Sequence, residues 1–126
     1  DPVLVFEEKR LWPLKGNVPT DPDHLVPIGK ADVKREGSNV TLIAIAGALR
    51  PALDAVEALA REGISVEVID PRTLKPLDHE TFKTSVAKTG RVVIVENAHR
   101  VCNVGSEIAA VMAEEAFELL KQPILR

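Results

Sequence analysis

From Asn39 onward, the chain alternates short runs of apolar residues with longer stretches in which apolar residues recur at helical spacing. The predicted order is strand Val40–Ala46, helix 49–62, strand Val66–Asp70, helix 79–88, strand Val92–Glu96 and helix 106–121. Strands that alternate with helices are typical of a parallel sheet, and nearly continuous apolar strands are typical of a sheet covered on both faces. The sequence therefore predicts a three-layer α/β fold, with a mostly parallel sheet, helices on both faces and right-handed crossovers.

The ends of the first two helices carry recognisable signals. Gly63 and Gly90 follow these helices, and glycine accepts the left-handed conformation that ends a helix. Asp78 is a favourable N-cap for the second helix, and Leu77 before it can pack on Phe82 at the fourth helical position. These signals support the predicted boundaries.

The last predicted helix has an unusually wide apolar stripe. One face carries Ile108, Val111, Met112, Ala116, Leu119 and Leu120, and the stripe is widened by Ala110, Ala113 and Phe117. A stripe of this width exceeds that of a surface helix. We therefore expect burial on more than one side, by the sheet and the amino-terminal segment or by another chain.

Residues 1–38 follow a different pattern. Asp1–Phe6 is typical of an edge or terminal strand, whereas the residues from there to Ser38 show no sustained apolar period. This stretch contains Pro13, Pro19, Pro22 and Pro27, and glycines at positions 16, 29 and 37. Such a composition is typical of a loop that crosses a surface, and so long a loop is uncommon inside a compact domain. We interpret it as a linker between two domains, one of which is missing.

Composition narrows the classes of function. A net charge of -3 and a content of three Phe, one Trp and no Tyr argue against binding to nucleic acid or to an anionic membrane. Cys102 is the only cysteine, which excludes an internal disulfide and fits a reducing compartment. Neither a signal peptide nor an apolar run of about 18 residues is apparent. We expect a cytoplasmic location, or an organelle matrix in a eukaryote.

The corner after the second predicted strand holds charged residues in a rigid frame, because Pro71 and Pro76 restrict the backbone around Arg72. The carboxyl ends of parallel strands meet at one edge of an open sheet, where ligands and partners bind. We expect that edge to gather Asp70, Arg72, Glu96, Asn97, His99 and Arg100. The hypothesis is that this edge contacts another protein. The alternative is that these are ordinary solvated loop residues.

Other polar groups fit neither a catalytic nor a metal site. His99 and Cys102 lie three residues apart, but nucleophilic catalysis also needs an orienting group and an oxyanion hole. His24, His79 and His99 lack the spacing of metal ligands. The glutamates of the last helix are more simply its solvated face: Glu107, Glu114, Glu115 and Glu118.

A small Rossmann-like nucleotide-binding module and a phospho-receiver domain are alternatives from another class. Asp70 ends the second strand, where a dinucleotide fold places the carboxylate that binds the ribose. However, the loop Ala46–Pro51 has one glycine where the phosphate-binding motif needs three. A phospho-receiver domain needs an acidic pair after the first strand, where this chain has alanine and glycine. We expect the chain to bind neither NAD nor ATP.

Three blocks of the sequence resemble the beta subunit of thiamine-dependent 2-oxo acid dehydrogenases, such as pyruvate dehydrogenase. They are Val26–Gly37, Val66–Asp78, and Arg91–Glu96 followed by Gly105–Ala109. Pro123–Arg126 is similar to the strand after the last helix of that family's transketolase-type carboxy-terminal domain, and Asp1–Glu7 to the final strand of the preceding domain. The resemblance implies that residues 39–126 are this domain without its last segment. Residues 1–38 are then the end of the preceding domain and the interdomain linker.

The resemblance implies part of an oxidoreductase in a multienzyme complex. The family's motif for thiamine diphosphate and magnesium, Gly-Asp-Gly followed by Asn, belongs to the alpha subunit and does not occur here. The family's catalytic glutamate and histidine lie upstream of Asp1. We therefore expect no catalytic, cofactor-binding or metal-binding residue in this chain, and no activity from the chain alone.

The resemblance also implies partners for the domain. They are the missing amino-terminal domain, the alpha subunit, a second beta subunit and the lipoyl acyltransferase, for which this domain forms part of the docking surface. The domain would support assembly rather than catalysis, and the sequence does not identify the 2-oxo acid. The nearest alternative is the carboxy-terminal domain of another thiamine enzyme, acetoin dehydrogenase or transketolase.

Overall fold

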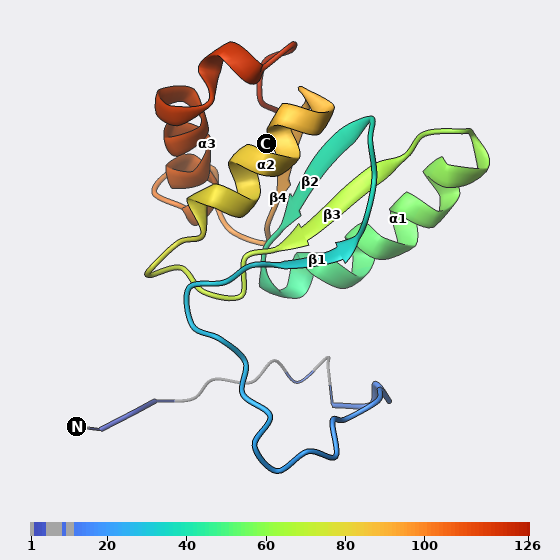
Figure 1. The fold of residues 1–126 in the computed structure, drawn as a ribbon, viewed down its shortest axis with the longest axis vertical. Coiled ribbons are helices and arrows are strands. Elements are labelled where there is room, and N and C mark those ends of the chain that lie inside the picture. The colour runs from blue at the N-terminus through green and yellow to red at the C-terminus, as the bar shows by residue number, and fades with distance from the viewer. Residues whose placement is uncertain (1, 5–8, 10–11) are drawn as a thin grey trace.

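The computed structural model describes residues 2–4, 9 and 12–126, which form a four-stranded sheet with helices on both faces (Figure 1). The strands are β1 (Asp32–Arg35), β2 (Val40–Ala44), β3 (Val66–Asp70) and β4 (Val92–Val95), in the spatial order β1-β3-β2-β4. Strand β2 is parallel to both β3 and β4, with Ile43 opposite Ile69 on one side and Ile94 on the other. The prediction of a mostly parallel sheet is confirmed.

Three helices complete the layers. Helix α1 (Leu49–Arg61) covers one face of the sheet, and α2 (His79–Thr89) and α3 (Val104–Glu115) cover the other (Figure 1). Successive strand residues point to opposite faces, so the strands contribute to two separate cores. The α1 side contains Leu42, Ala44, Ala52, Val56, Val66 and Val68. The other side contains Ile43, Ile69, Phe82, Val86, Val92, Ile94, Ile108, Val111, Met112 and Ala116. The predicted three-layer fold is confirmed.

The helix-end signals are also confirmed. The Asp78 carboxylate accepts a hydrogen bond from Thr81 N, as expected of an N-cap, and α2 ends at Gly90 with a φ of 70°. Gly63 follows α1 with a φ of 80°. Leu77 packs against the core cluster that contains Phe82. Local residue chemistry therefore accounts for the beginning of α2 and for the ends of both helices.

The predicted length of the last helix is wrong. Helix α3 begins at Val104, because Asn103 caps it through a hydrogen bond from Ser106 N (2.8 Å), and it ends at Glu115. A short 3-10 turn, η3 (Phe117–Leu119), follows. The chain then returns to the sheet, where Leu125 pairs with Val93 in a parallel bridge. This tertiary pairing requires the chain to leave the helix, and it leaves Phe117 and Leu119 exposed.

Strand β1 lies within the segment that was predicted to be a linker without regular structure. It pairs antiparallel with β3 at the edge of the sheet, with an irregularity between Val33 and Arg35. Its sequence, Asp-Val-Lys-Arg, has no apolar alternation because it lies at an edge, where charged residues are favoured. Of the strand expected at residues 1–6, positions 1, 5 and 6 lie outside the described residues, and residues 2–4 are not in a strand. Within the described part of the chain, no helix is long and apolar enough to span a membrane.

Phe82 and Phe117 differ in burial, and replacing each of them tests which one belongs to the core. Phe82 is 0% exposed and Phe117 is 69% exposed. We expect Phe82→Ala to lower the free energy of unfolding by about 3–5 kcal/mol, because it leaves a cavity in the core. Phe117→Ala is the control and should change it by no more than about 0.5 kcal/mol. Urea denaturation of both variants measures the difference, and equal losses would contradict this assignment of the core.

Candidate functional site

The corner after β3 binds the chain segment that leads into β1. Gly29 N donates a hydrogen bond to Thr73 Oγ1 (2.9 Å), and Ala31 N donates to Asp78 Oδ2 (3.0 Å). The Arg72 guanidinium donates to Asp32 Oδ2 (2.7 Å). We call these three contacts the clamp. The clamp joins two segments about 40 residues apart in the sequence.

Asp78 joins the clamp to helix α2. One carboxylate oxygen accepts from Thr81 N (3.3 Å), while the other accepts from Thr81 Oγ1 (2.8 Å) as well as from Ala31 N. The residue is 5% exposed. Burial opposes its ionisation, but the hydrogen bonds from Ala31 and Thr81 outweigh burial and hold the pKa of Asp78 below its ordinary value. One carboxylate therefore starts a helix and fixes the incoming chain.

At the edge formed by β1 and β3, the basic side chains of Lys34 and Arg72 lie beside the carboxylate of Asp32. Asp32 lies opposite Asp70 in the sheet, and Lys34 Nζ lies 2.6 Å from the Asp32 carboxylate. The hydrogen bond from Lys34, together with the nearby charge of Arg72, holds the pKa of Asp32 below its ordinary value although burial opposes ionisation. Asp70 Oδ1 accepts from Arg72 N (3.0 Å). Both acids are thus held by contacts within the domain.

The carboxyl edge of the sheet contains three residues other than glycine with positive φ. Ala46 follows β2, Arg72 follows β3 and Cys102 precedes α3, with φ values of 50°, 57° and 56°. Such conformations cost energy and tend to occur at functional positions, where surrounding contacts hold them. For Arg72, the hydrogen bond to Asp32 in the clamp is a contact that holds this conformation.

The structure places two of the six predicted edge residues at the end of β3 and the other four after β4. Asp70 and Arg72 line a cavity of about 470 Å³, whose other lining residues are Val26, Ile45, Ala46, Pro71 and Leu74. Glu96 and Arg100 line a smaller cavity of about 160 Å³ beside Arg126. Asn97 and His99 are exposed in the loop after β4. Whether these residues contact another protein stays a prediction.

Glu96 also has a role within the domain. Its Oε1 atom accepts a hydrogen bond from Gly105 N (2.9 Å) in the first turn of α3. A carboxylate near the amino end of a helix is favoured by the helix dipole. Glu96 therefore connects the end of β4 to the beginning of α3.

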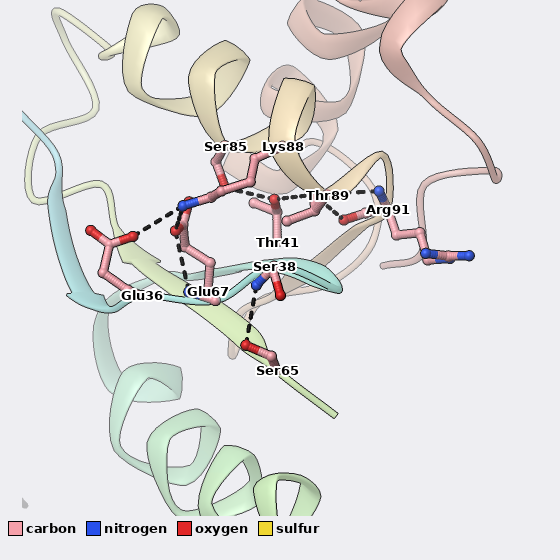
Figure 2. Close-up of polar contacts among 10 residues, drawn as sticks. Glu36, Ser38, Thr41, Ser65, Glu67, Ser85, Lys88, Thr89 and Arg91 are labelled. Atoms are coloured by element: carbon pink, nitrogen blue, oxygen red, sulfur yellow. Dashed lines mark hydrogen bonds and ion pairs between the residues drawn. The ribbon is translucent and has the colours of Figure 1, made fainter. Parts of the chain in front are cut away.

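A buried cluster of hydroxyl groups lies between the sheet and α2 (Figure 2). Thr41 Oγ1 lies 2.6 Å from Ser85 Oγ and 2.7 Å from Thr89 Oγ1, and Thr89 Oγ1 donates to Arg91 O (3.3 Å). The first three residues are almost fully buried. This cluster was not predicted, because Thr41 lies in a nearly continuous apolar run of the sequence. The threonine itself was the available signal, since a buried hydroxyl needs a partner.

A buried carboxylate lies beside this cluster. The Glu67 side chain is 3% exposed and forms an ion pair with Lys88, whose Nζ also lies 3.0 Å from Glu36 Oε2. Gly37 N donates to Glu67 Oε2 at 3.4 Å. Burial opposes the ionisation of Glu67, but hydrogen bonds from Lys88 and then Ser85 outweigh it, so its pKa lies below the ordinary value. This pair was not predicted, although Glu67 inside an apolar strand was a signal for it.

The polar groups in these places bind one another and so connect the elements of the domain. Among the described residues, no buried side-chain nitrogen or oxygen lacks a hydrogen-bond partner, and no group of three His, Cys, Asp or Glu residues could hold a metal ion. His79 Nδ1 lies 2.8 Å from Glu115 Oε1, and Cys102 is exposed. The arrangement can fix helices and the incoming chain on the sheet.

The clamp predicts the effect of removing the Asp78 carboxylate. Asp78→Ala should lower the free energy of unfolding by about 1–3 kcal/mol, because α2 loses its cap and Ala31 N loses its acceptor. Asp54→Ala is the control, since it breaks only an exposed pair with Arg50 and should cost about 0.5 kcal/mol or less. Hydrogen exchange at the Ala31 amide should accelerate in the first variant alone. Unchanged exchange there would contradict the clamp.

The lowered pKa of Glu67 predicts a pH dependence of stability. The unfolded chain takes up this proton more readily than the folded one, so stability falls as the pH drops through and below the ordinary value of 4.5. We expect Glu67→Gln to reduce the slope of unfolding free energy against pH between about pH 5 and 3. Glu57→Gln, which removes an exposed carboxylate of α1, is the control. A slope that is the same in both variants would argue against the pair.

Comparison with known proteins identifies the family of the chain. The sequence model described as "Transketolase, C-terminal domain" matches residues 29–126. A solved structure titled "Split gene transketolase, inactive beta4 tetramer" is 34% identical and superposes with a TM-score of 0.73, over 83% of this chain and 34% of that one. Both matches agree with the fold described above.

Curated relatives match the chain from end to end. The acetoin:2,6-dichlorophenolindophenol oxidoreductase subunit beta of Bacillus subtilis is 45% identical over 126 residues, which are 100% of this chain and 36% of that protein. The 2-oxoisovalerate dehydrogenase subunit beta of B. subtilis is 46% identical, over 100% of this chain and 38% of the relative. The pyruvate dehydrogenase E1 component subunit beta of Staphylococcus epidermidis is 43% identical, over 100% and 39%. The chain thus spans between 36% and 39% of the length of these relatives. It belongs to the family of transketolase carboxy-terminal domains, whose model matches residues 29–126.

Proposed function

We propose that this chain is the carboxy-terminal domain of the beta subunit of a thiamine-dependent 2-oxo acid dehydrogenase, an oxidoreductase that decarboxylates a 2-oxo acid. The observation that carries the proposal is the end-to-end likeness, at 46% and 43% identity, to beta subunits of two such enzymes. The matching fold supports it. The identities to relatives named for different substrates are nearly equal, so they do not select one substrate.

The role proposed for the domain is assembly. The charged groups Arg72, Asp78, Glu96 and Lys88 already bind other parts of the domain, which supports a scaffold rather than a catalytic site. The exposed loop after β4 and the cavity beside Arg72 remain available for contacts. The partners in this proposal are the preceding domain, the alpha subunit, a second beta subunit and the lipoyl acyltransferase.

Among the described residues, no group of three His, Cys, Asp or Glu side chains could hold the magnesium that accompanies thiamine diphosphate. Magnesium needs carboxylate oxygens that are free to coordinate it. The carboxylates of Glu67, Asp78 and Glu96 at the sites described above are each bound by N–H groups or by Lys88. In the proposed enzyme, other parts of the protein therefore hold the cofactor, and this domain contributes by keeping those parts in position.

Acetoin oxidation is the second candidate, because the relative that carries this name is 45% identical over the whole chain. The two candidates differ in the substrate of the enzyme, whereas in both of them this chain is the carboxy-terminal domain of the beta subunit. An assay of the longer polypeptide with both kinds of substrate separates them.

The proposal predicts activity only in the assembled enzyme. The longer polypeptide that contains this chain is produced with the alpha subunit, and the reduction of an artificial electron acceptor is measured with pyruvate, a branched 2-oxo acid and acetoin. We expect turnover of a 2-oxo acid that requires thiamine diphosphate and both subunits, whereas the 126-residue chain alone gives none. Turnover of acetoin alone would select the second candidate. Failure with all three substrates would overturn both.

A further inference from the structure

The segment from Gly29 to Gly37, which we call the edge segment, contains β1 and forms one border of the sheet. None of its residues is buried, whereas all residues of β2 and β3 other than Val40 and Asp70 are buried. Ala31 packs against the core on the α2 side, and Val33 is 36% exposed. A part of a protein with few buried apolar contacts can open while the rest stays folded.

The backbone pairing of the edge segment is also limited. Three residue pairs join β1 to β3, and an irregularity lies between Val33 and Arg35. Strand β2, in contrast, forms four pairs with β3 and four with β4. The attachment of the edge segment therefore depends on its side-chain contacts more than that of a central strand does.

Two carboxylates hold the beginning of the edge segment. Asp78 Oδ2 accepts a hydrogen bond from Ala31 N (3.0 Å). The Asp32 carboxylate lies 2.7 Å from Arg72 Nη2 and 2.6 Å from Lys34 Nζ. Such contacts are strongest when the carboxylate is ionised. The other charged residues close to these two acids are Lys30, near Asp78, and Asp70, opposite Asp32.

A third carboxylate holds the end of the edge segment (Figure 2). Glu67 of β3 accepts a hydrogen bond from Gly37 N (3.4 Å) and forms an ion pair with Lys88 of α2. Lys88 Nζ also lies 3.0 Å from Glu36 Oε2, so Lys88 and Glu36 are the charged residues that face Glu67. Lys88 therefore joins the end of the edge segment to both β3 and α2.

We propose that the edge segment is a pH-sensitive latch, which protonation of Asp32, Glu67 and Asp78 releases from β3 while the rest of the sheet stays folded. This inference does not rest on the proposed function. In the folded chain the pKa of each of these carboxyls lies below its ordinary value. Release breaks the contacts of Asp32 and the hydrogen bonds from Ala31 and Gly37, so the released form takes up protons more readily.

The direction of the pH dependence follows from these lowered pKa values. The contribution of the carboxylates to attachment is complete above the ordinary values of 3.8 for Asp and 4.5 for Glu, and it is lost as the pH falls through and below them. Each proton taken up on release raises the ratio of released to attached form by up to about tenfold per pH unit. Strands β2 and β4 contain no acidic residue and are held by apolar contacts, so acid weakens the edge segment first.

Hydrogen exchange of the longer polypeptide that contains this chain, measured by mass spectrometry of its peptides, tests the inference. After correction for the intrinsic rate, we expect the edge segment to exchange at least about tenfold faster at about pH 3.5 than at about pH 6, which one proton taken up over one pH unit suffices to produce. Peptides from β2 and β4 should stay at least about tenfold slower than the edge segment at both pH values.

A pair of double variants separates the carboxylates from general effects of charge. Asp32→Asn with Asp78→Asn removes both charges at the beginning of the edge segment and keeps oxygens that can accept hydrogen bonds. Asp54→Asn with Glu57→Gln is the control, because it removes two exposed charges from α1. We expect the first double variant to reduce the acceleration by acid at least about threefold, and the control to leave it unchanged.

The same acceleration in the wild type and in both double variants would overturn the inference. Exchange of β2 and β4 as fast as that of the edge segment at the lower pH would overturn it too, because the domain would then unfold as one unit. The wild type decides even where a variant does not fold, since an edge segment that acid does not accelerate is no latch.

Discussion

Strands β2 and β3 are covered on both faces, and this constraint determines how the polar residues of the core are arranged. A buried hydroxyl or carboxylate without a partner costs more than its hydrogen bond would contribute. Thr41 and Glu67 therefore take their partners from the helix above them, from Ser85, Thr89 and Lys88. These pairs fix the rotation and position of α2 on the sheet more narrowly than apolar packing alone, because hydrogen bonds are directional.

At the carboxyl edge of the sheet, polar side chains likewise bind other parts of the same domain. In many open parallel sheets this edge presents polar groups to a ligand. Here Glu96 binds the first turn of α3, and Asp78 and Arg72 bind the segment before β1. The edge holds the domain and its connecting chain together, which agrees with a supporting part of a larger enzyme.

The sequence predicted those elements whose signals are local. The strand Val66–Asp70 agrees to the residue, because its apolar run is bounded by Ser65 and Pro71, and helix α2 agrees because Asp78 and Gly90 mark its ends. The carboxyl-edge positions of Asp70 and Arg72 followed from their place at the end of the strand Val66–Asp70 and just after it. Strand β1 was missed because its charged sequence gains its structure from pairing with β3. The partner of Glu67 was missed for a related reason, since only the folded chain brings Lys88 beside it.

Strand β1 comes from the chain before residue 39, yet it is the outer strand of the sheet. A fragment cut at that residue would leave the backbone N–H and C=O groups along one side of β3 unpaired, beside the apolar Val68 and Ile69. An open edge of this kind is a template on which strands of other molecules add. The connecting chain therefore also shields the sheet from misassembly, and the sheet begins before Asn39, where the alternation of strands and helices starts in the sequence.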